Sequence, residues 1–191
     1  GALAERQLGD PLDLATDIGP LINDNARAGL ERHVARMQAE ATLIARGTLP
    51  DGLENGSFMA PHIFEIPDLA MLENEEFGPI LHVIRFAPGD LDRVMADIQA
   101  TGFGLTFGVH SRIEGRWRKL FDANAVGNTY VNRNMIGAVV GVQPFGGMGL
   151  SGTGPKAGGP HYLPRFAVEK VLTVNTAAIG GNTELFRLSE D

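Results

Sequence analysis

The residues best suited to hold a ligand lie in a glycine-rich stretch, GAVVGVQPFGGMGLSGTGPKAGG, at residues 137–159. It contains nine glycines, and Lys156 is its only charged residue. Backbone amides can approach an anion closely where side chains are absent, so this composition fits a ligand-binding loop. Val139, Phe145 and Leu150 favour burial, which argues against a flexible linker. A tightly packed connection between two elements explains the pattern equally well, and the residues alone leave both interpretations open.

Other residues capable of chemistry are less organised. The acidic run at residues 73–76 could accept hydrogen bonds from hydroxyl groups, or it could be a solvated loop. Lys156 does not complete a phosphate-binding loop, because Ala157 stands where serine or threonine is needed. No two histidines stand at metal-ligand spacing, so the sequence predicts no metal site. The histidines are His33, His62, His82, His110 and His161.

The composition is that of an ordinary globular protein, with 43% apolar and 20% charged residues in a chain of 191. A formal net charge of -7 argues against nucleic acid or an anionic membrane surface as the main partner. No apolar run approaches the roughly 18 residues of a transmembrane helix, and we expect a cytoplasmic protein. The chain has no cysteine, so it supplies no disulfide, thiolate metal ligand or cysteine nucleophile.

Hydrophobic spacing predicts three helices and a set of strands between them. The first helix begins at Asn23 and runs to Gly47, because apolar residues from Ala26 to Ile44 recur every three or four positions. The other helices are predicted at residues 91–98 and 113–121, and the strands at 57–66, 80–86, 105–109 and 127–132. This alternation indicates an α/β fold with a parallel sheet.

The segment at residues 165–176, RFAVEKVLTVNT, follows the compact α/β region and is predicted to form one long strand. A strand that leaves its own domain often pairs with another chain. The residues after it, AAIGGNTELFRLSED, are expected to be irregular.

Five short motifs follow one another along the chain: E-x-F-G-P at residues 75–79, G-L-T at 104–106, V-N at 131–132, P-F-G-G at 144–147 and S-G at 151–152. In this order and spacing they resemble the C-terminal part of the aldehyde dehydrogenase superfamily, over nearly all of this chain. The stretches GAVVGVQPFGG, SGTGPKAGGPHYLPRF and TVNTAAIGGN more specifically resemble the L-glutamate γ-semialdehyde (Δ1-pyrroline-5-carboxylate) dehydrogenase branch. Within that branch, the likeness is to the C-terminal module of bacterial bifunctional proline-utilisation enzymes.

The resemblance implies an α/β, partial aldehyde dehydrogenase fold in which residues 1–164 are the C-terminal portion of the catalytic domain. Residues 165–178 would be an oligomerisation-flap strand, and residues 179–191 an irregular tail. NAD would be the cofactor, and FAD would be involved only if a proline dehydrogenase module lies upstream. The expected partners are a small semialdehyde substrate, the rest of the parent polypeptide and further copies of the same chain.

The family's chemistry needs groups that this chain does not contain. In the superfamily a cysteine attacks the aldehyde, and a glutamate activates the water that hydrolyses the resulting thioester. Both residues lie N-terminal to the part that this chain matches. The resemblance therefore implies no catalytic residue here, and we expect the isolated chain to be inactive.

The resemblance does assign binding residues. Glu75 would accept hydrogen bonds from the cofactor ribose, and Phe77 would pack against the nicotinamide. The amides of Gly137 and Ala138 would anchor the α-carboxylate of the substrate, and Phe145 would form an apolar wall beside the aldehyde. A solvated acidic loop at Glu75 and ordinary core packing of the two phenylalanines remain alternatives.

Two further interpretations of the whole chain stay open. It could be a non-catalytic scaffold or oligomerisation module that keeps the fold without the chemistry. It could also belong to a dehydrogenase for another ω-semialdehyde, in which case the anchor at residues 137–141 would differ in its ligand.

Overall fold

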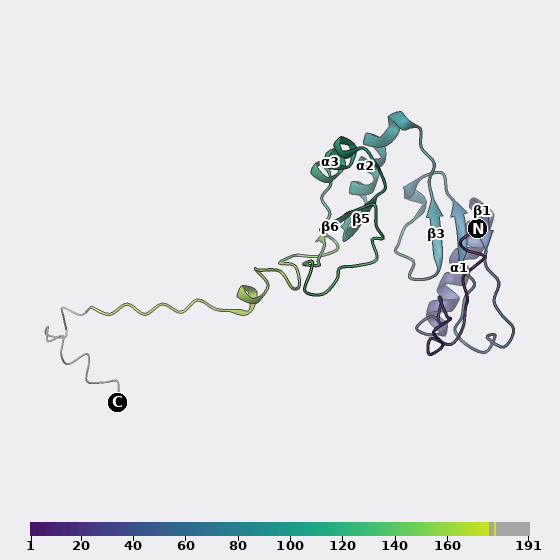
Figure 1. Ribbon diagram of the computed structural model, residues 1–191, viewed down its shortest axis with the longest axis horizontal. Helices are drawn as coiled ribbons and strands as arrows, with labels where there is room; N and C mark the ends of the chain where they lie inside the picture. The colour runs from purple at the N-terminus through teal and green to yellow at the C-terminus, as the bar shows by residue number, and fades with distance from the viewer. Residues whose placement is uncertain (176–177, 179–191) are drawn as a thin grey trace. The chain divides into compact units, whose positions relative to one another are not determined.

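A computed structural model describes residues 1–175 and residue 178, and the chain divides into two compact units (Figure 1). The first unit comprises Gly1–Thr101, and the second begins at Gly102. Each unit has its own helices and paired strands, so each is described by itself.

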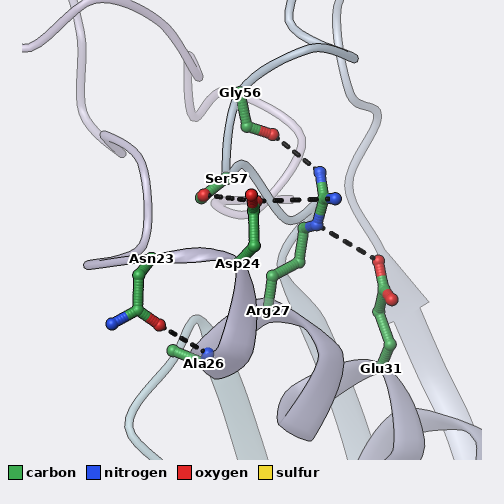
Figure 2. Close-up of polar contacts among 7 residues, drawn as sticks. All are labelled: Asn23, Asp24, Ala26, Arg27, Glu31, Gly56 and Ser57. Atoms are coloured by element: carbon green, nitrogen blue, oxygen red, sulfur yellow. Dashed lines mark hydrogen bonds and ion pairs between the residues drawn. The ribbon is translucent and has the colours of Figure 1, made fainter.

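The first unit is organised around helix α1, Asp24–Glu40. Asn23 caps its N-terminus as expected, because the side-chain oxygen accepts a hydrogen bond from the Ala26 amide at 2.9 Å (Figure 2). Leu30, Val34 and Met37 are buried, at the spacing that places residues on one face of a helix. This face provides one side of the hydrophobic core of the unit.

Polar contacts around Arg27 tie the first turns of α1 to a neighbouring loop (Figure 2). The Arg27 guanidinium donates to the Gly56 carbonyl at 2.8 Å and lies 3.6 Å from Asp24 and 3.7 Å from Glu31. The Ser57 hydroxyl donates to Asp24 at 2.7 Å. Asp24 also places a negative charge in the first helical turn, where the helix dipole favours it.

A three-stranded sheet completes this core. Its strands are β1 (Thr42–Arg46), β2 (His62–Glu65) and β3 (Ile80–Val83), in the order β1-β2-β3. Strand β1 is antiparallel to β2, and β3 is parallel to it. Phe64 of β2, with no exposed surface, packs with Met59 and Ile66 against the buried face of α1.

The predicted single helix from Asn23 to Gly47 is wrong at its C-terminal end. Helix α1 ends at Glu40, and the next residues form β1, in which Thr42 pairs with Glu65 and Arg46 with His62. Ala41 and Ile44 continue the helical spacing, so the sequence pattern carries no sign of the break. Pairing with β2 satisfies the backbone of these residues, and β-branched side chains such as Ile44 fit a strand well.

The remainder of the first unit follows the prediction more closely. Helix α2, Leu91–Ala100, buries Met95 and is preceded by a 3₁₀ turn at Pro88–Asp90. A second 3₁₀ turn, Leu69–Met71, lies between β2 and β3.

The second unit contains a parallel strand–helix–strand arrangement. Strand β5 (Thr106–Val109) pairs in parallel with β6 (Asn128–Val131), and helix α3 (Glu114–Ala123) connects them. A short antiparallel pair joins β4 (Phe103–Gly104) to β7 (Met148–Gly149). The α/β class is therefore confirmed, but the pairing is mixed and not wholly parallel.

The strand predicted at residues 165–176 is not formed within the described part of the chain. Leu163–Phe166 form a 3₁₀ turn, and residues 167–175 join no backbone ladder (Figure 1). A strand needs a partner for its N–H and C=O groups, and the described residues offer none to this segment. Val168, Val171 and Leu172 are exposed along it. The tail at residues 179–191, predicted to be irregular, lies outside the described residues.

Candidate functional site

Two surfaces, one in each unit, carry the predicted binding residues. In the first unit they lie in the acidic segment, residues 73–79, between a 3₁₀ turn and β3. Glu75 is exposed, and its carboxylate forms no hydrogen bond or ion pair with a described residue. Phe77 is also exposed, at 78% of its surface, so the alternative of ordinary core packing does not hold within this unit. Both side chains are accessible to a ligand.

The backbone of the acidic segment is fixed on both sides of Phe77. Gly78 packs so tightly on Leu30 of α1 that a Cβ at this position would overlap the leucine side chain. The His62 amide of β2 donates to the Pro79 carbonyl at 3.0 Å. The exposed residues therefore lie on a backbone that is held against the core.

Glu76 faces inward and contacts a pair of histidines. Its carboxylate lies 3.3 Å from Nδ1 of the buried His33, whose Nε2 is 2.9 Å from Nε2 of His82. Burial lowers the pKa of both histidines, and Glu76 opposes this effect by stabilising the charged rings. Sequence reasoning missed this pair, because the two residues stand 49 positions apart and share no motif.

A hollow of about 430 Å³ lies next to these groups. It combines basic and acidic side chains, so it is suited to polar ligands rather than apolar ones. Its lining residues are Gly29, Arg32, His33, Arg36, Glu73, Asn74 and Glu76. Arg36 is already engaged, since its guanidinium donates twice to the Met71 carbonyl, each time at 3.2 Å.

In the second unit, Gly137 and Ala138 present two successive backbone amides. Neither amide donates to a described residue, and both residues are half-buried. A Cβ on Gly137 would meet no atom, so there is room beside it. Adjacent N–H groups without internal partners are able to bind an anion. The next amide, that of Val139, donates to the Gln143 side chain at 3.2 Å.

Phe145 lies in residues 144–147, which we call the Phe145 loop. Hydrogen bonds to its backbone hold this loop in place. Phe145 and Ala157 exchange two backbone hydrogen bonds, of 3.0 and 2.9 Å. Asn128 of β6 donates to the Pro144 carbonyl at 2.9 Å and accepts from the Gly146 amide at 3.3 Å. The Asn128 side chain thus hydrogen-bonds to the residues on both sides of Phe145 and holds the backbone of the loop in place.

Close backbone packing completes this arrangement. A Cβ on Gly127 would overlap the Gly146 carbonyl, and the Lys156 ammonium donates to the Gly127 carbonyl. The glycine-rich stretch therefore has two parts. Residues 144–152 form a tightly packed connection, which was one of the two interpretations of the sequence. Residues 137–142 have few close neighbours and are mostly exposed.

The V-N motif at residues 131–132 and the S-G motif at residues 151–152 have structural roles. Asn132 has a left-handed backbone, with φ of 57°, and its side chain both accepts from the Ser111 amide at 2.9 Å and donates to the Ser111 carbonyl at 3.0 Å. Ser151 accepts from the Gly104 amide at 3.0 Å. These hydrogen bonds join segments next to the strands of this unit, and none of them involves Gly137 or Phe145.

Glu75 and Phe77 thus lie in one unit, and Gly137, Ala138 and Phe145 lie in the other. Within residues 1–175 and 178, no three histidine or carboxylate side chains are arranged to hold a metal ion. In the same residues, no helix combines the length and apolar character required to cross a membrane.

Comparison with known proteins gives consistent results. The sequence profile of the Aldehyde dehydrogenase family matches residues 2–172. The chain is 49% identical over 185 residues to the bifunctional protein PutA of Escherichia coli, and 38% identical over 159 residues to the 1-pyrroline-5-carboxylate dehydrogenase of Geobacillus kaustophilus. These alignments cover 93% and 82% of this chain.

Solved structures agree with these relatives. A proline utilization A variant from Bradyrhizobium japonicum superposes with a TM-score of 0.87 at 58% identity, over 93% of this chain. A 1-pyrroline-5-carboxylate dehydrogenase from Thermus, solved with bound NAD, gives 0.75 at 37% identity over 85%. The chain spans only 14% and 30% of the two curated relatives, and 18% and 31% of the two solved chains. Its fold is part of the aldehyde dehydrogenase fold, and the chain belongs to the aldehyde dehydrogenase family.

Proposed function

We propose that this chain is the C-terminal part of an NAD-dependent L-glutamate γ-semialdehyde dehydrogenase, which oxidises the semialdehyde to glutamate. The observation that carries the proposal is the pair of unpartnered amides at Gly137 and Ala138, in a chain whose relatives include 1-pyrroline-5-carboxylate dehydrogenases. A substrate with an α-carboxylate offers an anion that two successive unpartnered amides are able to bind.

The residues of the first unit fit the cofactor. The free carboxylate of Glu75 can accept hydrogen bonds from both hydroxyls of a ribose, and exposed Phe77 offers an aromatic surface to a flat ring. NAD, when bound, supplies the hydride acceptor for the oxidation. The role of this chain would be to hold the ribose and to restrain the ring.

The residues of the second unit would hold the substrate. Gly137 and Ala138 would bind its carboxylate, and Phe145, fixed by Asn128 and Ala157, would present an apolar wall near the aldehyde. The cysteine nucleophile and the general-base glutamate would come from the remainder of the parent polypeptide, because this chain has no cysteine. A proline dehydrogenase module with FAD would take part only if it precedes the chain in that polypeptide.

The test is an activity assay on the complete parent polypeptide and on this chain alone. The parent is expected to form NADH with L-glutamate γ-semialdehyde, and the isolated chain is expected to form none. NADH formation by the pure chain would show that it needs no external nucleophile. A parent that binds neither NAD⁺ nor the semialdehyde would instead support a scaffold.

A substrate series separates this activity from that of a dehydrogenase for another ω-semialdehyde. We expect kcat/KM to fall steeply for an aldehyde of the same length without the α-carboxylate, because the two amides would lose their anion. Equal kcat/KM for the two aldehydes would exclude the proposed anchor.

The segment at residues 165–178 has a proposed role in oligomerisation. The exposed apolar residues of this segment, and residues 168–174, which pair with no described strand, suit pairing with a second copy of the chain. Light scattering over a concentration series would reveal this association, and a parent enzyme that stays monomeric throughout would exclude it.

A further inference from the structure

The acidic segment is attached to helix α1 at several points. Two residues before it begins, Arg36 binds the Met71 carbonyl. In its middle, Glu76 meets His33. At its end, Gly78 packs on Leu30. Glu76 is the only one of the residues from Glu75 to Phe77 whose side chain has such an attachment, since the side chains on either side of it are exposed.

The histidine pair extends this attachment into the sheet. His33 belongs to α1 and His82 to β3, and their rings meet nearly at right angles, with centroids 5.1 Å apart. The contact between the two Nε2 atoms, 2.9 Å long, has room for one proton. If the proton of His33 is on Nδ1, facing Glu76, its bare Nε2 accepts the N–H of His82. One hydrogen-bonded chain then runs from β3 through α1 to Glu76.

We propose that His33 and His82 are positioning residues, which act through the Glu76 carboxylate to fix how Glu75 and Phe77 face the cofactor. The proposal rests on the proposed function, because it takes Glu75 and Phe77 as the cofactor-contacting residues. Glu76 faces inward while the side chains before and after it are exposed, so an anchor on Glu76 fixes the direction in which its two neighbours point. Loss of the anchor would let all three side chains rotate.

Protonation state matters to this contact. A further proton on the bare Nε2 of His33 would place two N–H groups against each other, which breaks the hydrogen bond between the rings. The charged groups that face the pair are Glu76 from the acidic segment and Arg36 from α1, with Arg32 and Glu73 at the neighbouring hollow. Burial lowers the pKa of both rings, and Arg36 adds to this effect while Glu76 opposes it, so the neutral pair is the form expected at neutral pH.

The experiment compares three variants of the complete parent polypeptide: E76Q, H82Q and the control E73Q. Glu73 lies in the same segment and carries the same charge, but it forms no hydrogen bond or ion pair with a described residue. The dissociation constant of NAD⁺ is measured by calorimetry at neutral pH, with the KM of the semialdehyde and the Tm beside it. We expect E76Q and H82Q to raise the dissociation constant about threefold or more and to leave the KM unchanged. E73Q should match the unvaried protein.

A pH series separates positioning from simple stabilisation. In the unvaried protein, NAD⁺ affinity should fall as the pH drops below about 6.5, and H82Q should flatten this dependence. If E76Q and H82Q lower the Tm but keep the affinity and pH profile of E73Q, the histidines are merely structural and the proposal is overturned. A parent that binds no NAD⁺ at any pH overturns the proposed function, and this inference with it.

Discussion

The acidic segment of the first unit and the Phe145 loop of the second present ligand-facing residues by different physical means. The acidic segment is held by side chains of a packed helix, including His33, Arg36 and Leu30. The Phe145 loop is held mainly by backbone, through Ala157 and the close approach of Gly127 to Gly146. The acidic segment should therefore be sensitive to truncation of side chains and to pH. The Phe145 loop should be sensitive to side-chain atoms added at its glycines.

The largest effect is expected from truncating the core beneath the acidic segment. Phe64 is fully buried among α1 and the sheet, so Phe64→Ala should lower the free energy of unfolding by about 3–5 kcal/mol. Phe77→Ala is the matched control, because the same truncation at an exposed site should change it by less than about 0.5 kcal/mol. Urea denaturation followed by circular dichroism measures both. A similar loss for the two variants would mean that the first unit lacks this core.

The second unit should respond to one added methyl group. In Gly127→Ala the new Cβ would collide with the Gly146 carbonyl, and relief requires a backbone shift that costs about 2 kcal/mol or more. Gly137→Ala adds the same atom where nothing stands near, so it should be almost neutral. The fluorescence of Trp117, the only tryptophan, reports on this unit through α3. If Gly127→Ala unfolds at the same urea concentration as Gly137→Ala, backbone packing does not hold the Phe145 loop.

The sequence predicted the elements whose signals are local. Helices α2 and α3 and strand β6 lie where hydrophobic spacing and turn residues place them. Strand β1 was missed because Ala41 and Ile44 fit a helix as well as a strand, and only pairing with β2 decides between the two.

The candidate site, like the fold, could be predicted only in part from the sequence. Motif order identified the segments that carry Glu75, Phe77 and Phe145, and their roles stay predictions. The contacts that hold these segments could not be predicted, because they join residues far apart in the chain. His33 and His82 are separated by 49 positions, and Lys156 by 29 from the carbonyl that it binds.

A moderate effect is expected from Asn128, whose side chain hydrogen-bonds to the residues on both sides of Phe145. Asn128→Ala removes the partners of the Pro144 carbonyl and the Gly146 amide, which should cost about 1–2 kcal/mol of stability. Hydrogen exchange should quicken at the Gly146 amide, and Asn134→Ala, which removes no hydrogen-bonded side chain, should leave it unchanged. If exchange at Gly146 is unchanged in both variants, the hydrogen bonds to Ala157 and the close packing of the glycines are enough to hold the loop.

The smallest and most gradual effect concerns pH, and it should be confined to the first unit. Burial lowers the pKa of His33, His62 and His82, so the unfolded chain binds protons more readily than the folded one. Their contribution to stability is therefore complete above about pH 6.5 and declines as the pH falls through the lowered pKa values. Measurements between neutral pH and about pH 5 avoid the carboxylates, which titrate lower.

Hydrogen exchange can show which unit loses stability in this range. Amides of α1 should lose protection as the pH falls, once corrected for intrinsic exchange, while those of the β5–β6 pair keep it. H82Q should remove part of this dependence, and His33 and His62 should maintain the rest. His110→Gln is the control, since His110 is exposed in the second unit. Equal loss of protection in both units would contradict this prediction. Acid would then weaken the side-chain contacts of the acidic segment and the backbone contacts of the Phe145 loop to the same extent.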